Sequence, residues 1–249
     1  MGVLSLAAIP ATDAFVGLGG IGEVYRVFDA FGRRPLALKT LKRQFLGDPL
    51  AIDRFMREGL LTGTLQHPGI PPVYDHGRLD DGTPFFSMKL IEGQTFHEIL
   101  KSRHRDADRL GELIGIFETV AQTLAYAHSQ QIVHRDLKPQ NIMVGRFGEV
   151  QVMDWGLAKP LGENLLVIDE PDASAPSRTT PRAAEAEPDA STDAATPHGG
   201  DLTTAGDIVG TPGYMPPEQA LGDIDSVDAR ADVFALGAIL FQILFDRTL

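Results

Sequence analysis

The stretch His134–Asn141, which reads HRDLKPQN, combines three polar groups at short spacing. Asp136 offers a carboxylate that can accept a proton from a hydroxyl group, and Lys138 offers an ammonium that can neutralise a phosphate oxygen. The amide oxygen of Asn141 can bind a hard cation such as Mg²⁺. Taken alone, these residues could also form a polar surface loop with an ordinary proline turn, so the neighbouring segments decide between the two interpretations.

A glycine-rich stretch near the N-terminus is the second segment with a chemical pattern. Residues 17–24 read GLGGIGEV, in which the glycines recur as G-x-G-x-x-G before a valine. Glycine lets a backbone approach phosphate groups that a Cβ atom would block. Dinucleotide-binding folds also use this pattern, but there a helix opens at the glycines. Here residues 23–28 alternate like a strand, so we expect a strand–turn–strand hairpin and exclude a Rossmann-type dehydrogenase.

A lysine and a glutamate in the next two segments can form an ion pair. Lys39 ends the apolar stretch 36–39, which we expect to be a strand, although most lysines are simply solvated. A helix is predicted from about residue 48 or 49 to residue 65, and it supplies two acids. We prefer Glu58 to Asp53 as the partner of Lys39, because an Arg-Glu pair precedes the apolar run that closes the helix.

The same helix contains two glycines, Gly59 and Gly63. Each costs roughly 1 kcal/mol relative to alanine in a helix interior. We therefore expect this helix to be easily displaced, which would make the pair of Lys39 and Glu58 depend on its position.

Further strands and helices are expected before HRDLKPQN. Residues 71–75 and 84–90 read as two strands that complete a small antiparallel sheet. Residues 96–103 and 110–129 read as helices, the second of them clearly amphipathic. Its predicted buried face consists of Leu113, Ile114, Phe117, Val120, Ala121 and Leu124.

Two short strands and an aspartate follow HRDLKPQN. Residues 142–144 and 150–153 alternate like strands around a turn at 146–148. They lead to Asp154-Trp155-Gly156, where the glycine permits a sharp turn after the carboxylate. An apolar helix from Asp232 to Phe245 comes later in the chain. Asp232 would be either an ordinary acid at the N-terminus of this helix or a cap for the backbone of HRDLKPQN.

Composition narrows the function classes. The 249 residues include no cysteine, which excludes disulfides, cysteine zinc sites and thiol catalysis. The net charge of −12 argues against a nucleic-acid-binding surface. The longest apolar run, Val233–Phe245, is too short to span a bilayer, so we expect no membrane segment and a cytoplasmic location, with any tether outside these residues.

The acidic charge is concentrated in one segment. Residues 161–207 hold ten acids against two bases, which gives −8 of the −12. Residues 160–206 are rich in Pro, Ala, Ser, Thr and Asp and poor in aromatics. This composition buries too little surface to order itself, so we expect a long disordered insert.

Taken together, these motifs identify a resemblance. GGIGEVYR, HRDLKPQN and GTPGYMPPEQ occur in the order and spacing of the bacterial eukaryotic-like (Hanks-type) Ser/Thr protein kinases, and the resemblance covers about residues 14–249. It implies an α+β, bilobal fold with a tail at 1–13. The N-lobe, 14–88, would be a small antiparallel sheet with one helix, and the C-lobe, 89–249, mainly helical. Such kinases continue with further helices, so we expect an incomplete C-lobe.

The resemblance also implies a role for each candidate residue. ATP and Mg²⁺ (or Mn²⁺) would be the cofactors, with Asp136 as the base and the adenine between Val24, Ala37 and Met143. Trp155 stands where the family has phenylalanine, which puts the packing that sets active and inactive states in doubt. The implied residues are, for catalysis, Asp136, Lys138, Lys39, Glu58 and Thr211; for nucleotide binding, Gly17, Leu18, Gly19, Gly20, Gly22, Val24, Ala37, Lys39, Met88, Lys89, Ile91 and Met143; and for the metal ion, Asn141 and Asp154.

The expected partners are proteins with Ser or Thr acceptors, in signal transduction. Lys138, two residues after Asp136, favours Ser/Thr over Tyr as the acceptor in this family. A homodimer that autophosphorylates in trans is a further expectation, with Thr203 or Thr204 as acceptors and Arg135 as the partner of the phosphate. The alternative is a nucleotide-binding pseudokinase scaffold or an inactive fragment.

Overall fold

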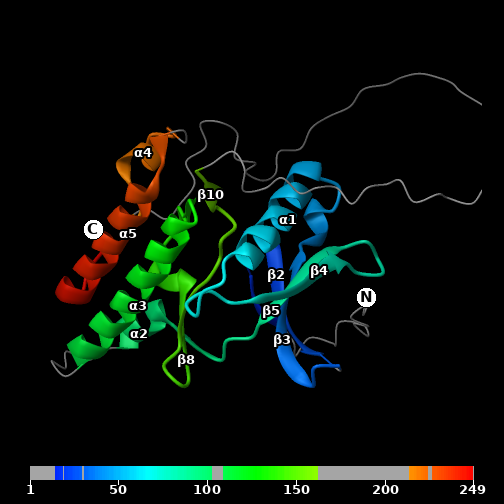
Figure 1. Cartoon of the computed structure of the whole chain (residues 1–249), viewed down its shortest axis with the longest axis horizontal. Coiled ribbons are helices and arrows are strands. Elements are labelled where there is room, and N and C mark those ends of the chain that lie inside the picture. Colours follow the sequence, from blue (N-terminus) through cyan, green and yellow to red (C-terminus); the bar gives the residue numbers. More distant parts are fainter. Residues whose placement is uncertain are drawn as a thin grey trace, which may run out of the picture.

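The computed structural model describes residues 15–18, 20–29, 31–102, 109–161, 213–223 and 226–248. These residues form two lobes, a β-rich N-lobe and a mainly helical C-lobe (Figure 1). The predicted α+β bilobal fold is therefore confirmed. Several predictions lie outside the described residues: the tail 1–13, residues 162–206 of the insert, Gly19, Thr211, and the acceptors Thr203 and Thr204.

The N-lobe is built on one five-stranded antiparallel sheet, in the order β1-β2-β3-β5-β4. The glycine-rich stretch connects two of its strands as a hairpin, as predicted. Strand β4, which was predicted from residue 71, begins two residues later at Val73. Pro71 and Pro72 precede its first paired residue, Val73. The strands are β1 (Phe15–Leu18), β2 (Gly22–Asp29), β3 (Arg34–Leu41), β4 (Val73–Arg78) and β5 (Pro84–Lys89).

The single long helix of the N-lobe, α1 (Pro49–Thr64), packs on one face of this sheet. Asp48 caps it, because its carboxylate accepts from the backbone N–H of Leu50 at 2.9 Å. Phe55 is fully buried and lies 5.3 Å from the Phe86 ring of β5. A Cβ on Gly59 would lie 3.0 Å from that ring, so glycine at this position allows the helix to approach the sheet closely.

The C-lobe core forms between three helices, α2 (Phe96–Ser102), α3 (Arg109–Ser129) and α5 (Ala229–Phe245). The buried face of α3 differs from the prediction at several positions. Ile114 is 36% exposed, and Phe117 and Ala121 are only partly buried. Ile116, Thr123 and Ala127, which were not predicted, are buried. The stripe therefore follows Leu113, Ile116, Val120 and Ala127, at helical spacing from the first buried leucine. Helix α5 begins three residues before Asp232, because Asp228 supplies its N-cap.

Short strands carry the chain between these helices. β6 (Gly93–Thr95), β8 (Ile142–Gly145) and β9 (Val150–Val152) form one small sheet, and β7 (Ile132–Val133) pairs with β10 (Lys159–Pro160). Two 3-10 turns, η1 (Arg43–Phe45) and η2 (Pro139–Asn141), and a short helix, α4 (Pro217–Ala220), complete the described elements. The β8–β9 hairpin places HRDLKPQN directly beside the Asp154 turn, because Met153 N donates to Asn141 O at 2.7 Å.

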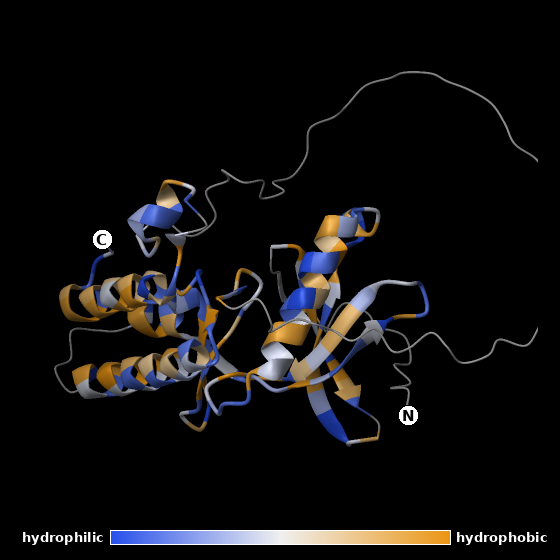
Figure 2. Ribbon diagram, turned by 45° about the horizontal axis from the view of Figure 1, so that its top comes forward, coloured by the Kyte–Doolittle hydropathy of each residue, from blue (hydrophilic) through white to orange (hydrophobic). Residues whose placement is uncertain are grey.

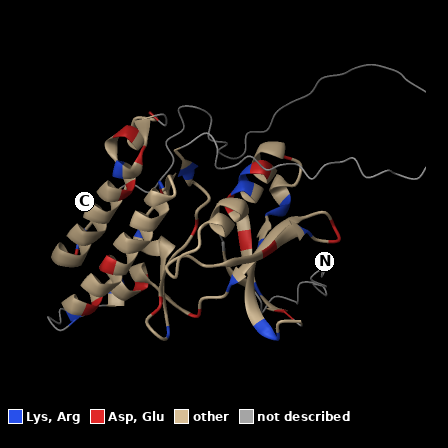
Figure 3. Ribbon diagram, viewed as in Figure 1, with Lys and Arg blue, Asp and Glu red and all other residues tan. Residues whose placement is uncertain are grey.

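Hydropathy and charge are distributed unevenly over this fold. Helix α5 is coloured mainly as hydrophobic (Figure 2), and it nevertheless exposes Val233, Phe234, Leu244 and Phe245. In the described residues no helix is long and apolar enough to cross a membrane. Acidic and basic residues are interspersed along the ribbon of both lobes (Figure 3).

Candidate active site

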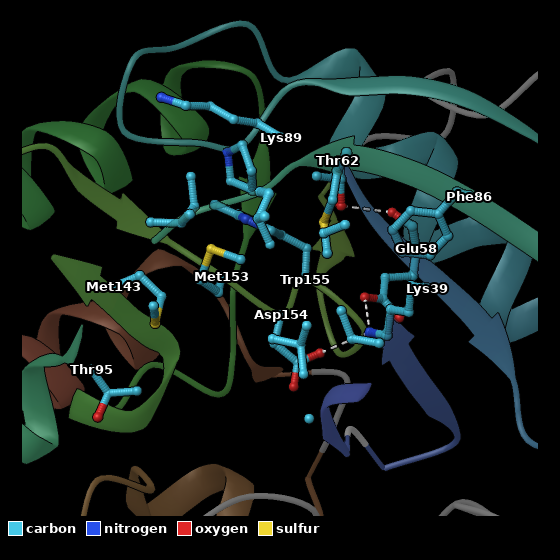
Figure 4. A pocket seen from close by; sticks show the side chains of 18 of the residues that line it. Lys39, Glu58, Thr62, Phe86, Lys89, Thr95, Met143, Met153, Asp154 and Trp155 are labelled. Atoms are coloured by element: carbon cyan, nitrogen blue, oxygen red, sulfur yellow. Dashed lines mark hydrogen bonds and ion pairs between the residues drawn. The ribbon is translucent and has the colours of Figure 1, made fainter. Parts of the chain in front are cut away.

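A cavity of about 330 Å³ lies at the junction of the two lobes (Figure 4). Its roof comes from the N-lobe sheet, its back wall from β5 and the segment after it, and its floor from the β8–β9 hairpin. The lining residues are Val16, Gly17, Val24, Ala37, Lys39, Glu58, Thr62, Pro71, Phe86, Met88, Lys89, Leu90, Ile91, Thr95, Gln140, Met143, Met153, Asp154 and Trp155.

Lys39 stands at the inner end of this cavity between two carboxylates. Strand β3 points its side chain toward α1, where Lys39 Nζ and Glu58 Oε1 form a buried ion pair. Asp154 Oδ1 lies 3.6 Å from the same ammonium group (Figure 4). The alternative partner, Asp53, is instead at the surface and pairs with Arg57 at 3.2 Å. The structure thus brings Lys39 to Glu58, which the sequence favoured, and not to Asp53.

The two carboxylates keep the lysine charged. Burial acts to lower the pKa of Lys39, but attraction to Glu58 and Asp154 outweighs it and raises that pKa above its usual value. Burial likewise acts to raise the pKa of Asp154, yet Lys39, His134 and Lys138 outweigh it and lower that pKa. An ammonium and a carboxylate are therefore held in their ionised forms at the inner end of the cavity.

The groups of HRDLKPQN converge on Asp136. Lys138 Nζ donates to Asp136 Oδ2 at 2.7 Å. The amide Nδ2 of Asn141 donates to Asp136 O at 2.8 Å and to its Oδ2 at 3.2 Å. Because the amide nitrogen faces Asp136, the amide oxygen of Asn141 is directed elsewhere and can act as a metal ligand. The structure therefore brings together three residues that the sequence selected.

A buried acid from α5 supports this loop from below. Asp232 is 1% exposed, and it accepts hydrogen bonds at 2.9 Å from the backbone N–H groups of His134 and Arg135. His128 Nε2 donates to the same carboxylate at 2.7 Å. The sequence indicated that Asp232 could cap the loop, but it gave no signal for His128, which lies 104 positions away.

Arg135 is already engaged within the loop. Its φ is 67°, in the left-handed region, and its Nε donates to Leu157 O at 2.6 Å. This contact joins HRDLKPQN to the residues just after Gly156. The predicted phosphate partners of Arg135 lie outside the described residues, so that part of the prediction remains a prediction.

The apolar part of the cavity has the residues expected to hold a flat heterocycle. Val24, Ala37 and Met143 line it from the two lobes, and the predicted residues of the connecting segment, Met88, Lys89 and Ile91, line its back. Sequence reasoning missed further lining residues. Two of them could have been found from their position in the sequence: Leu90 lies between the predicted residues Lys89 and Ile91, and Met153 directly precedes Asp154. The missed residues are Val16, Thr62, Pro71, Phe86, Leu90, Thr95, Gln140, Met153 and Trp155.

The glycines of the glycine-rich hairpin differ in how much space surrounds them. A Cβ on Gly17 or Gly20 would have no other protein atom within 4 Å, so protein packing does not require glycine there. The free space fits a phosphate-bearing ligand close to the backbone. By contrast, a Cβ on Gly22 would lie 2.9 Å from Lys39 Cε, so Gly22 makes room for the lysine. Leu18 ends strand β1 in the same hairpin.

Asn141 and Asp154 have the donor chemistry for a divalent cation. Oxygen ligands suit Mg²⁺ and Mn²⁺, and Mg²⁺ sites commonly use one or two protein ligands together with substrate phosphates and water. Among the residues that the structure describes, no group of three or more His, Cys, Asp or Glu side chains forms a closed metal site. The residues present thus fit an open site that a phosphate-bearing ligand would complete.

Comparison with known proteins supports the same assignment. Residues 11–172 match the family described as protein kinase domain. The chain is 36% identical over 239 residues to the serine/threonine-protein kinase PknD of Protochlamydia amoebophila, across 92% of this chain and 22% of that protein. It is 35% identical over 238 residues to PknD of Chlamydia pneumoniae, across 92% of this chain and 23% of that protein.

The chain spans less than a quarter of the length of these relatives. The family match nevertheless includes the glycine-rich hairpin, Lys39, Glu58, HRDLKPQN and the Asp154 turn, which together surround the cavity. It also covers more than half of the 249 residues. On the fold, the arrangement of the site and this match, the chain belongs to the protein kinase domain family.

Proposed function

We propose that this chain transfers the γ-phosphoryl group of ATP to Ser or Thr hydroxyls of proteins. The observation that carries the proposal is the position of Lys39, which the buried Glu58 carboxylate holds at the inner end of the cavity with Asp154 at 3.6 Å. Protein kinases use ATP with a divalent metal ion, and phosphoryl transfer depends mainly on positioned charges. Mg²⁺ is the ion that we propose, with Mn²⁺ as a substitute.

Each group of the site has a distinct task in this reaction. Lys39 holds the α- and β-phosphates, and the carboxamide of Asn141 and the carboxylate of Asp154 hold the metal ion, which would neutralise phosphate charge when bound. Asp136 orients the acceptor hydroxyl and accepts its proton. Lys138, at 2.7 Å from Asp136, places a positive charge where the γ-phosphate would arrive.

Two observations support the choice of protein hydroxyls as acceptors. The relatives that the chain resembles are named serine/threonine-protein kinases. In addition, Lys138, whose place two residues after Asp136 favours Ser/Thr acceptors, directly contacts Asp136. Autophosphorylation between two copies and a role in signalling are part of the same proposal. A pseudokinase scaffold is less favoured, since it need not retain Lys39, Asp136 and Asp154 together.

The decisive experiment is incubation of the chain with Mg²⁺ and γ-labelled ATP, followed by mapping of phosphorylated residues. We expect phosphoserine or phosphothreonine in the parent chain. Asp136→Asn should bind ATP as the parent does but lose about 10²-fold or more of the transfer rate, because the general base is gone. ATP binding without transfer by the parent would favour the scaffold, and equal rates for the two proteins would refute the role of Asp136.

A further inference from the structure

The Asp154 turn contains a hydrogen bond that a phenylalanine at position 155 could not make. Trp155 is 1% exposed, and its indole Nε1 donates to Val152 O at 3.1 Å. Phenylalanine, the residue of the D-F-G pattern that this motif resembles, has no donor atom for this carbonyl group. The bond closes a turn of four residues, from Val152 at the end of β9 to Trp155, and Asp154 lies inside it.

The ring of Trp155 is fixed on its other side by HRDLKPQN. His134 meets the indole edge-on, with ring centroids 4.7 Å apart. The same imidazole donates through Nε2 to Met153 O at 3.0 Å, and its Nδ1 accepts from Asp136 N at 3.3 Å. Two consecutive carbonyl groups, of Val152 and Met153, are thus bonded to two side chains that pack on each other.

The residue inside this turn has an unfavourable backbone conformation. Asp154 has φ 59°, in the left-handed region, which costs free energy for any residue except glycine. The conformation persists because the surrounding bonds determine it, and it brings Asp154 Oδ1 to 3.6 Å from Lys39 Nζ. The turn also packs tightly below Glu58, since a Cβ on Gly156 would lie 3.2 Å from Glu58 Oε2.

We propose that Trp155 is a positioning residue whose indole N–H, bonded to Val152 O, holds Asp154 in the conformation that faces Lys39. A phenylalanine could supply the packing on His134 but not the bond. The bond therefore favours the conformation in which the Asp154 carboxylate is turned toward Lys39. The consequence for nucleotide binding rests on the proposed function, whereas the claim about the conformation of the turn does not.

The chain provides its own probe, because Trp155 is its single tryptophan. In the parent, ¹⁵N labelling of tryptophan gives one indole N–H resonance. We expect this proton to exchange with solvent as slowly as buried amides of α3. Exchange at the rate of a solvated indole would overturn the proposal, because the bond would then not persist.

Replacement of the single tryptophan tests the bond without a change of ring size. In Trp155→benzothienylalanine, a sulfur atom stands in place of the N–H group. We expect faster amide exchange at residues 153–157, unchanged exchange in α3, and an affinity for ADP in the presence of Mn²⁺ that falls about two- to tenfold, the size of one neutral hydrogen bond. The affinity for metal-free ADP should not change.

Tyr126→Phe is the matched control, because it also removes one aromatic polar group bonded to backbone: the Tyr126 hydroxyl accepts from Gln66 N at 2.9 Å, away from the cavity. It should change neither the exchange at 153–157 nor the effect of Mn²⁺. Unchanged exchange at 153–157 in the benzothienylalanine protein, or a uniform increase across the whole chain, would overturn the proposal. If the parent binds no ADP but exchange rises at 153–157 alone, the proposed function fails and the positioning role stands.

Discussion

Loss of the Asp232 carboxylate is expected to damage the candidate active site from within the core. Asp232 is 1% exposed and accepts from two backbone N–H groups and from His128. In Asp232→Ala, the N–H groups of His134 and Arg135 would stay buried with no acceptor. Each unsatisfied group costs about 1–3 kcal/mol, so the two together predict a loss of about 2–6 kcal/mol in the free energy of unfolding.

Such a loss is large beside the roughly 5–15 kcal/mol by which domains are stable. Urea unfolding followed by circular dichroism measures it, and phosphoryl transfer under conditions where the variant remains folded measures the effect on the site. We expect transfer to fall more than ATP binding, because the two N–H groups belong to HRDLKPQN. Asp232→Asn should be milder, since one oxygen can still accept.

Asp228→Ala is the matched control on the same helix. Asp228 caps the start of α5 through Arg230 N at 2.8 Å, but it is exposed to solvent. We expect a clearly smaller loss of stability and no change in transfer. If the two alanine variants lose similar stability and keep similar transfer rates, the buried carboxylate does not support the loop in the way described.

Two further predictions follow from α1 and Lys39. Gly59→Ala should destabilise the N-lobe by up to about 2 kcal/mol in urea unfolding, because the new Cβ would lie 3.0 Å from the Phe86 ring. Overpacking costs about 1–3 kcal/mol, whereas the gain in helix propensity is about 1 kcal/mol. An increase in stability would contradict this prediction. The stability advantage of the parent over Lys39→Met should shrink as pH rises above about 10.4 and as pH falls below about 3.9. Because the pKa of Lys39 is raised in the folded state, its contribution to stability is present below the unfolded pKa of about 10.4 and is lost as pH rises through the folded pKa. Because the pKa of Asp154 is lowered in the folded state, its contribution is present above the unfolded pKa of about 3.9 and is lost as pH falls through the folded pKa. Urea unfolding at a series of pH values measures this, and an advantage that grows at either end would refute it.

Much of the fold and of the family was accessible from the sequence because the relevant signals are local. The glycine-rich hairpin, the strand that ends near Lys39 and the α1 helix each depend on residues a few positions apart, and the structure has all three. The order of these motifs along the chain indicated the protein kinase family, which the comparisons confirm. The roles of the individual site residues remain predictions.

Other features required the folded chain, because they depend on contacts between distant residues. Helical periodicity alone selected Ile114 for the core, but packing against the other helices buries Ile116. The bond of His128 to Asp232 spans 104 positions, and no local pattern marks it. Likewise, the resemblance implies that Trp155 stands where a phenylalanine is expected, but only the tertiary structure shows its N–H bonded to Val152 O.

The sequence by itself determined which groups are available for chemistry: a base at Asp136, ammonium groups at Lys39 and Lys138, and oxygen ligands at Asn141 and Asp154. Only the tertiary structure decided which carboxylate meets Lys39 and how Asp154 is turned toward it. The physical reason is that residue types and spacing specify local conformation, whereas ion pairs and buried hydrogen bonds between lobes form only when the whole core has packed.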